Sequence, residues 1–338
     1  MTVNKKILII NTGGTISSVR TAHGFTPKQG CLQKTLPKIL GLSHPAMPAY
    51  DIHEYNPLLD SSNMTLAQWN VIALDISKHY LHYDGFVVLH GTDTMAYTAS
   101  ALSFMLENLG KAVILTGSQI PLSEARNDAV DNVVTSLWLC ANTDIKEVCI
   151  YFDNQLLRGN RARKVSAESM SAFASPNYPN LAEIGIHIHV HQEYCLPPPT
   201  AAFKLQQLSS HFIANFRLFP GFSSEVLRFL LEQPVQGLVL ETFGAGNAQS
   251  NLPSFLHLLR QASDKGVVMV NCTQCLHGKV EMSQYETGQR LQEAGLVSAD
   301  DMTPEATHCK LLYLFSKYQD VALIKAQMVL NLRGEMSS

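Results

Sequence analysis

Short apolar runs alternate with longer amphipathic stretches through the first half of the chain. The runs are bounded by glycine or polar residues and are rich in β-branched side chains, which is typical of strands buried on both faces of a sheet. They cover residues 6–10, 85–89, 112–116 and 147–152, and a further strand is expected at 50–55. Between them, helical spacing of apolar residues predicts helices over 66–80, 95–108 and 125–141. This order predicts an α/β fold with a parallel, Rossmann-like sheet and right-handed crossovers.

The second half of the chain predicts a smaller domain of the same class. Residues 153–200 are less regular and end in a proline-rich segment, 196–200, which is typical of a stiff linker. Beyond it, strands are expected at 235–240 and 266–270, and helices at 252–263, 304–318 and 320–332. We therefore expect a larger N-terminal domain over 1–195, a linker over 196–212 and a smaller C-terminal α/β domain over 213–338.

The first strand is followed directly by a glycine pair and a threonine. Gly13 and Gly14 allow a tight turn where a side chain would clash, and Thr15 leaves the turn with its hydroxyl. Ligands of open parallel sheets bind at the carboxyl ends of the strands, so this hydroxyl is placed where chemistry usually occurs. An ordinary turn or an anion cradle remains open as an alternative, although the sequence matches neither common phosphate-binding motif.

Two further polar loops follow neighbouring strands, at Asp60-Ser61-Ser62 and at Thr92-Asp93. A threonine hydroxyl is a weak nucleophile that needs a base or a relay to one, and Lys164 in the cationic run 158–164 can serve. Backbone N–H groups of the glycine turn could hold an oxyanion. Asp93 could pair with a substrate ammonium, and Ser61 and Ser62 could hold a substrate carboxylate.

Composition excludes several other classes of function. The net charge is −3 and no dense basic stripe is present, which argues against a nucleic-acid partner. No apolar stretch approaches about 18 residues, so no membrane partner is expected, and no signal peptide is visible. Seven cysteines are an odd number, as expected of reduced thiols in the cytoplasm. Neither the Cys272–Cys275 spacing nor the alternating histidines 187, 189 and 191 is completed by further ligands, so no metal is expected.

Two sequence motifs carry a family resemblance. The segments TGGTI at 12–16 and HGTDTM at 90–95 resemble the bacterial-type L-asparaginase family. Further segments resemble the intracellular, type I branch of this family: DSSNM at 60–64, GSQIP at 117–121, RGNR at 158–161, FASPN at 173–177, GAGN at 244–247 and TQC at 273–275. The resemblance covers nearly the whole chain.

This resemblance implies a reaction and a set of roles. Thr15 matches the nucleophile that attacks the side-chain amide carbon of L-asparagine and forms a β-aspartyl ester, with ammonia leaving; water then releases L-aspartate. Thr92, Asp93 and Lys164 match the group that activates a nucleophile or water. Asp60, Ser61 and Ser62, together with Thr92 and Asp93, match the substrate-binding residues. No cofactor is implied, and the partners implied are the substrate and further copies of the chain in a homodimer or homotetramer.

The sequence departs from the family pattern at two positions. Phe25 aligns to a tyrosine of the mobile loop, or lid, that lends its hydroxyl to the first threonine. We expect Thr92 with Lys164, or a water, to replace that hydroxyl. Some intracellular members also bind a second asparagine as an allosteric activator, and Thr273 and Cys275 match that site. An arginine of that site aligns to Glu241, whose charge repels a carboxylate, so we expect activation to be absent or the effector altered.

Three alternatives to a plain asparaginase are open at this point. Glutamine is one methylene longer, a difference that discriminates by only about 1–3 kcal/mol, so minor glutaminase activity is possible. The amidase half of a tRNA-dependent amidotransferase shares this fold family, but the sequence lacks an extended N-terminal domain and a basic surface. A third alternative is an amino-acid sensor that has kept the pocket and lost turnover.

Overall fold

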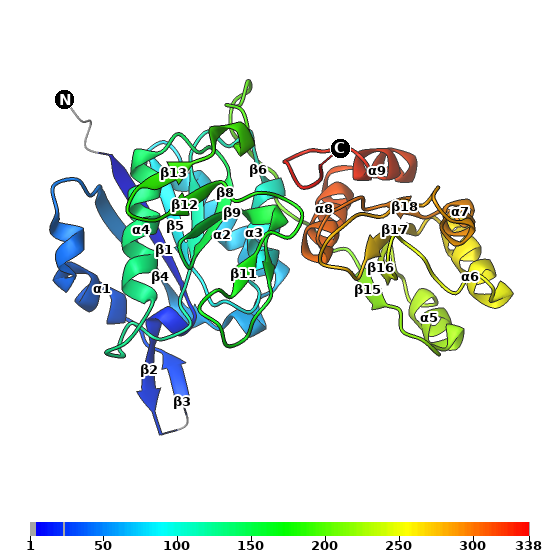
Figure 1. The fold of residues 1–338 in the computed structure, drawn as a ribbon, viewed down its shortest axis with the longest axis horizontal. Coiled ribbons are helices and arrows are strands. Elements are labelled where there is room, and N and C mark those ends of the chain that lie inside the picture. Colours follow the sequence, from blue (N-terminus) through cyan, green and yellow to red (C-terminus); the bar gives the residue numbers. More distant parts are fainter. Residues whose placement is uncertain (1–4, 23, 338) are drawn as a thin grey trace. The chain divides into compact units, whose positions relative to one another are not determined.

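The chain forms two compact units. The computed structural model describes residues 5–22 and 24–337, so residues 1–4, 23 and 338 lie outside the description. The N-terminal unit contains the residues up to Ser175 together with Pro179–Leu205. The C-terminal unit contains Pro176–Tyr178 and the residues from Gln206 onward. Figure 1 colours the chain from blue at its start to red at its end.

An eight-stranded sheet forms the core of the N-terminal unit, in the order β13-β12-β9-β8-β7-β5-β1-β4. The five strands from β8 to β4 are parallel: β8 (Val148–Phe152), β7 (Val113–Thr116), β5 (Gly85–Leu89), β1 (Lys6–Gly13) and β4 (Ala49–Leu59). Their side chains are almost entirely buried except along the edge strand β4. The predicted parallel α/β sheet is thus confirmed, because these are the strands that the apolar runs marked.

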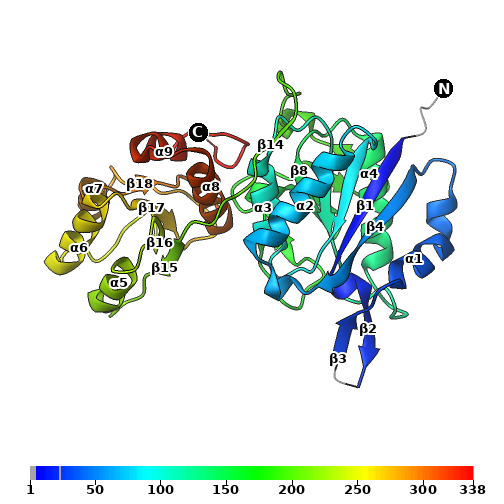
Figure 2. The ribbon, with the colours of Figure 1, turned by 180° about the vertical axis from the view of Figure 1, so that it is seen from behind.

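Helices cover both faces of this sheet. α2 (Leu66–His79) and α3 (Met95–Met105) lie on one face, in front of the sheet in Figure 2, and α4 (Ala129–Asn142) lies on the other, in front in Figure 1. α2 begins where the sequence predicts, since the Gln68 side chain accepts a hydrogen bond of 2.7 Å from the backbone N–H of Thr65. It buries Trp69, Ala73 and Ile76 at helical spacing.

The sheet differs from the prediction beyond β8. The chain turns back there into β9 (Gln155–Arg158), which is antiparallel to β8, and β12 (Ala182–Ile184) and β13 (Ile188–Val190) extend the sheet by further antiparallel pairs. Sequence analysis expected irregular chain over 153–200. The sheet is therefore mixed rather than wholly parallel.

Three predicted helices differ from their expected bounds: the one predicted over 320–332 ends at Met328, and two lie in the N-terminal unit. The helix predicted over 95–108 ends at Met105, because Leu106-Glu107 (β6) pairs with Lys204–Leu205 (β14) as an antiparallel ladder. The helix predicted over 125–141 begins at Ala129, because the Asp128 carboxylate accepts hydrogen bonds from the N–H groups of Gln119 and Ile120. Asp128 thereby holds the loop that precedes α4 in a non-helical conformation.

Short elements surround the sheet. Thr15–Ser17 forms a 3-10 turn, followed by a hairpin of β2 (Ser18–Thr21) and β3 (Gly24–Pro27) that projects from the sheet (Figure 1). The other short elements are α1 (Cys31–Thr35), β10 (Arg163–Lys164), β11 (Phe173–Ala174) and the 3-10 turns Leu36–Lys38, Leu40–Ser43, Ser61–Asn63, Gly159–Arg161 and Gln192–Tyr194.

The C-terminal unit is a smaller parallel α/β structure. Its four strands lie in the order β15 (Ile213–Arg217), β16 (Gly237–Thr242), β17 (Val268–Thr273) and β18 (Val297–Ser298). Its helices are α5 (Ser224–Leu231), α6 (Pro253–Asp264), α7 (Glu286–Glu293), α8 (Pro304–Lys317) and α9 (Val321–Met328). Leucine, valine, phenylalanine and methionine side chains form one core between these elements. The smaller C-terminal α/β architecture is confirmed, although β15, α5, α7 and β18 were not predicted.

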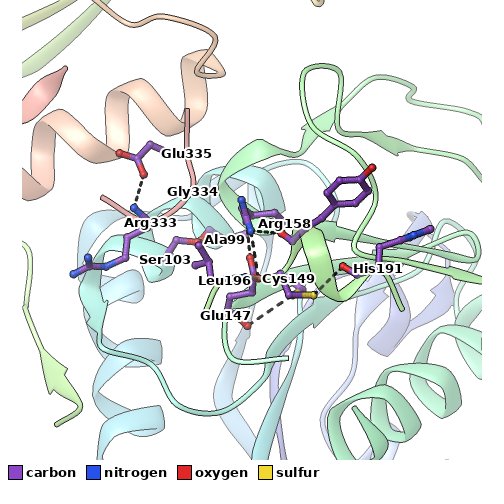
Figure 3. Close-up of polar contacts among 12 residues, drawn as sticks. Ala99, Ser103, Glu147, Cys149, Arg158, His191, Leu196, Arg333, Gly334 and Glu335 are labelled. Carbon is purple, nitrogen blue, oxygen red and sulfur yellow. Dashed lines mark hydrogen bonds and ion pairs between the residues drawn. The ribbon is translucent and has the colours of Figure 1, made fainter. Parts of the chain in front are cut away.

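A buried ion pair stabilises each unit. In the N-terminal unit, the Glu147 carboxylate lies 2.6 Å from Arg158 Nε, and it also accepts a 2.7 Å hydrogen bond from the N–H of Leu196 (Figure 3). In the C-terminal unit, Lys310 Nζ lies 2.6 Å from the Glu335 carboxylate, and both side chains are fully buried. Glu335 also accepts a 2.6 Å hydrogen bond from the N–H of Arg333 (Figure 3).

Among the described residues, no helix combines the length and apolar character that crossing a membrane requires. Histidine, cysteine and carboxylate side chains of the same residues form no group of three that could hold a metal ion.

Candidate active site

Three loops meet at one edge of the N-terminal sheet. β1 lies between β4 and β5, and all three run in the same direction, with Asn11 opposite both Glu54 and Leu89. Their carboxyl ends therefore share an edge, as expected of ligand sites in parallel sheets. The loop after β1 carries Thr15, the loop after β4 carries the substrate-binding candidates Asp60, Ser61 and Ser62, and the loop after β5 carries Thr92 and Asp93.

Glycines let these loops touch through their backbones. A Cβ atom on Gly14, which has a φ of 81°, would lie 2.4 Å from Cα of Gly91. A Cβ atom on Gly91 would in turn lie 2.4 Å from Oγ of Ser61. A side chain at either glycine would push the loops apart. The turn that carries Thr15 is thus packed against the residue that precedes Thr92, and that residue is packed against Ser61.

Hydrogen bonds fix the three loops in these positions. The Thr12 hydroxyl donates to the Leu89 carbonyl oxygen at 2.8 Å, and the N–H of Gly14 donates to the Leu59 carbonyl oxygen at 3.1 Å. The Thr94 hydroxyl donates to the Ser61 carbonyl oxygen at 2.7 Å, which joins the loop after β5 to the loop after β4. Sequence analysis gave Thr94 no role beyond its place in the motif.

Lys164 reaches this edge from the short strand β10. Its Nζ donates to Thr92 Oγ1 at 2.9 Å and to an Asp93 carboxylate oxygen at 2.6 Å. Thr92 is buried and the Lys164 side chain is one-fifth exposed, whereas Asp93 is open to solvent. Since the lysine donates to Thr92 Oγ1, the Thr92 proton can be directed at a different acceptor. The structure therefore brings Thr92, Asp93 and Lys164 into one hydrogen-bonded group.

The remaining substrate-binding candidates offer charge and hydroxyl groups at the same edge. Thr15 is half-buried, Ser61 is buried, and Asp60 and Ser62 are exposed. Asp60 accepts a 3.0 Å hydrogen bond from the N–H of Ser62 and so caps its own loop. Two carboxylates, Asp60 and Asp93, can complement a cationic group, while the hydroxyls can bind polar atoms of a small ligand.

The lid candidate Phe25 lies on the β2–β3 hairpin, a few residues after Thr15. Its ring is 44% exposed and lies 4.6 Å from the Arg20 guanidinium carbon on the facing strand. The base of the hairpin is closed by a 2.9 Å bond from the N–H of Lys28 to the Ser17 carbonyl oxygen. The hairpin is thus anchored next to the threonine turn.

The effector-site candidates lie at the carboxyl edge of the C-terminal sheet. Glu241, near the end of β16, pairs with Arg217 on β15 at 3.5 Å. At the end of β17, the Thr273 hydroxyl donates to the Gly244 carbonyl oxygen at 2.6 Å and accepts from the N–H of Cys275 at 3.0 Å. Arg217 was not singled out from the sequence, although its position opposite Glu241 follows from the parallel pairing of β15 and β16.

The sequence and the fold of this chain are similar to those of other proteins. The family description "Asparaginase, N-terminal" matches residues 6–195, and "Glutaminase/Asparaginase C-terminal domain" matches residues 213–328. The protein L-asparaginase 1 of Escherichia coli is 49% identical over 333 residues, which are 98% of each chain. The crystal structure of L-asparaginase I from Vibrio cholerae matches with a TM-score of 0.94 at 49% identity, over 99% of this chain and 100% of that one. The thermostable L-asparaginase from Thermococcus kodakarensis matches with a TM-score of 0.89 at 32% identity, over 98% of this chain and 99% of that one.

Proposed function

The chain belongs to the asparaginase family, and from this premise we propose that it hydrolyses L-asparagine to L-aspartate and ammonia. The observation that carries the proposal is the contact of the Thr15 turn with the loop of Thr92 and Asp93, to which Lys164 is bonded. The same sheet edge carries the Thr15 hydroxyl, the hydrogen-bonded group of Thr92, Lys164 and Asp93, and a second carboxylate, Asp60. Such a set of groups suits cleavage of an amide on an amino acid. The identity of 49% to a protein named L-asparaginase 1, over nearly all of both chains, supports asparagine as the substrate.

In the first proposed step, Thr15 Oγ1 forms a bond to the side-chain amide carbon of asparagine. The carbon–nitrogen bond breaks, the hydroxyl proton goes to the departing nitrogen, and ammonia leaves with a β-aspartyl ester on Thr15. Negative charge develops on the amide oxygen in the transition state, and backbone N–H groups of the packed turns can donate to it. All bonds made and broken in this step involve substrate and Thr15.

In the second proposed step, water forms a bond to the ester carbon, the bond from that carbon to Thr15 Oγ1 breaks, and one proton of the water passes to Thr15 Oγ1 as L-aspartate leaves. Thr92 Oγ1 orients this water by accepting a hydrogen bond from it, and the Lys164 ammonium, which also donates to Thr92 Oγ1, stabilises negative charge that develops nearby. Lys164 in turn is held by the Asp93 carboxylate. Asp93 and Asp60 bind the substrate ammonium, and Ser61 and Ser62 bind the substrate carboxylate.

Ammonia release from L-asparagine and from L-glutamine tests this function. We expect turnover of asparagine and a value of kcat/KM for glutamine that is lower by about 10- to 200-fold, the range that one methylene supports. A protein that releases no ammonia from asparagine while asparagine raises its melting temperature would be a sensor, and the proposal would fail.

We further propose that the active form is a homodimer or homotetramer in the cytoplasm. The family resemblance supports the assembly, and light scattering on the purified chain measures it. All seven cysteines are free thiols, which suits a reducing compartment. Fractionation of cells that express the untagged chain would identify the compartment.

Phe25→Tyr is expected to change kcat for asparagine by less than about threefold. The reason is that neither proposed step uses a hydroxyl from the hairpin: the Thr15 proton passes to the departing nitrogen in the first step, and Thr92 with Lys164 orients the water in the second. Steady-state kinetics on both proteins make the comparison, with Phe25→Leu as the matched control that loses the ring and its contact with Arg20. A large gain in kcat for the tyrosine variant would show instead that the missing hydroxyl limits the rate.

The asparagine saturation curve is expected to be hyperbolic. The Glu241 carboxylate repels the carboxylate of a second asparagine and already occupies the Arg217 guanidinium. Initial rates over a wide range of asparagine concentration give the Hill coefficient, which we expect to be about 1. Glu241→Gln, which releases Arg217, is the control: sigmoidal kinetics in this variant alone would support the block by Glu241, whereas a sigmoidal wild-type curve would contradict it.

A further inference from the structure

A chain of three buried side chains leads from the helices to the loop of Thr92. His90 follows β5 directly and is completely buried. Its Nδ1 lies 2.7 Å from the Gly91 carbonyl oxygen, and its Nε2 lies 2.9 Å from the hydroxyl of Thr98 on α3. Trp69 on α2 donates its indole N–H to the same hydroxyl at 3.0 Å.

The direction of every hydrogen bond in this chain is determined. A carbonyl oxygen can only accept, so His90 Nδ1 carries a proton and donates to Gly91. Burial lowers the pKa of His90 to about 4, so the ring is neutral at ordinary pH and Nε2 has no proton. Nε2 therefore accepts from the Thr98 hydroxyl, whose oxygen accepts from the indole of Trp69. Both ring nitrogens of His90, the Thr98 hydroxyl and the Trp69 indole N–H are thus paired, and the imidazole is held as a single tautomer.

The end of this chain is the peptide unit that joins Gly91 to Thr92. This unit is planar, so a bond that fixes the Gly91 carbonyl also fixes the N–H of Thr92, which points in the opposite direction. Gly91 has no side chain with which to anchor itself, yet its backbone touches both Gly14 and Ser61. A rotation of this peptide would therefore disturb the turns that carry Thr15, Ser61 and Thr92 together.

We propose that His90 is a positioning residue, which holds the Gly91–Thr92 peptide by donating from Nδ1 and so sets the geometry between Thr15 and Thr92. The inference rests on the proposed function, because the geometry between Thr15 and Thr92 matters when water attacks the β-aspartyl ester on Thr15. The two ring nitrogens of His90 are bonded to Gly91 and Thr98. His90 therefore acts on the Thr92 loop through the backbone and is not itself bonded to the hydroxyl of Thr92 or the ammonium of Lys164.

A matched pair of variants tests the donated bond. His90→Asn places an amide nitrogen at the position of Nδ1 and can keep the donor, whereas His90→Leu removes it. We expect kcat for asparagine to fall by about 10- to 100-fold in His90→Leu, as for misplacement of reacting groups, and by less than about threefold in His90→Asn. The change in KM should be smaller than the change in kcat. A role only in folding would instead lower the melting temperature of both variants and leave kcat of the folded fraction unchanged, which would overturn the proposal.

A spectroscopic measurement keeps the test independent of activity and of the folding of His90→Leu. In the ¹H–¹⁵N spectrum of the wild-type imidazoles, signals missing from His90→Asn identify His90. We expect a protonated Nδ1 and an unprotonated Nε2 that persist to pH values near 4. A protonated Nε2 in the wild type would overturn the proposal even if asparagine is hydrolysed. If asparagine is not hydrolysed but Nδ1 carries the proton, the proposed function is wrong and the positioning role of His90 in the fold still stands.

Discussion

Thr15→Ala is expected to lower kcat for L-asparagine by about 10⁴-fold or more. The variant loses the oxygen that forms the ester, and the neighbouring hydroxyls of Ser17 and Ser18 already donate to Asn11 Oδ1 and to the Gly14 carbonyl oxygen. Removal of the nucleophile in enzymes that use a covalent intermediate costs this much or more in kcat. The contacts of Gly14 with Gly91 and of Gly91 with Ser61 do not involve the Thr15 side chain, so the turns should keep their positions.

The measurement combines ammonia release with calorimetric binding of asparagine. We expect the dissociation constant to change by less than about tenfold, because Asp60, Ser61 and Asp93 are unaltered. Thr15→Ser is the matched control, since it keeps the hydroxyl and should keep a measurable fraction of the wild-type rate. Full activity in Thr15→Ala would exclude Thr15 as the nucleophile and would direct attention to Thr92.

Lys310→Met is expected to lower the free energy of unfolding by about 3–5 kcal/mol. Lys310 Nζ and the Glu335 carboxylate form a pair with no exposure to solvent, and the ammonium also lies close to the Leu330 carbonyl oxygen. Burial lowers the pKa of Lys310, and the charge and hydrogen bond of Glu335 oppose this shift by favouring the ammonium form. Removing the lysine leaves a buried carboxylate without its counter-charge, and that loss exceeds the gain from a well-packed methionine.

Urea unfolding followed by circular dichroism measures this change. Arg228→Gln is the control, because Arg228 forms ion pairs on the exposed surface of α5, and we expect almost no effect. The double variant Lys310→Met/Glu335→Gln removes both charges and should recover part of the lost stability. A single variant as stable as the Arg228 control would show that the pair contributes little to folding.

Two of the three strands that carry the candidate site, β1 and β5, were predictable because they are buried on both faces. Such strands read as continuous apolar runs, as β1 and β5 do, and polar residues follow at once where the chain reaches the sheet edge. The antiparallel strand β9 was missed although a local signal existed. Asp153 and Asn154, both with positive φ, form the two-residue turn between β8 and β9, and these residue types favour that turn.

Other features depend on contacts between distant residues and leave no local pattern. Lys164 is 72 residues from Thr92, and its residue type in a cationic run suggested a base without any local pattern that predicts the contact. The early end of α3 also had no local signal, because it is set by pairing of β6 with Lys204–Leu205. The burial of Lys310 was not predictable either, since charged side chains are normally exposed. His90 could have been noticed as a polar residue at the end of a fully buried strand, but its partners on α2 and α3 could not.

The place of β1 in the sheet has a consequence for biosynthesis. β1 precedes both of its partners in the chain, since Lys6 pairs with Ala49 and Ile7 with Gly85. A ribosome that adds about 5–20 residues per second needs on the order of ten seconds to pass from the end of β1 to the end of β5. β1 has two unpaired edges until β4 is made and one until β5 is made, and until then the turn of Thr15 lacks the Gly91 backbone that it packs against. β1 is therefore made before both strands that flank it, and chaperones that shield nascent apolar strands would act first at this segment.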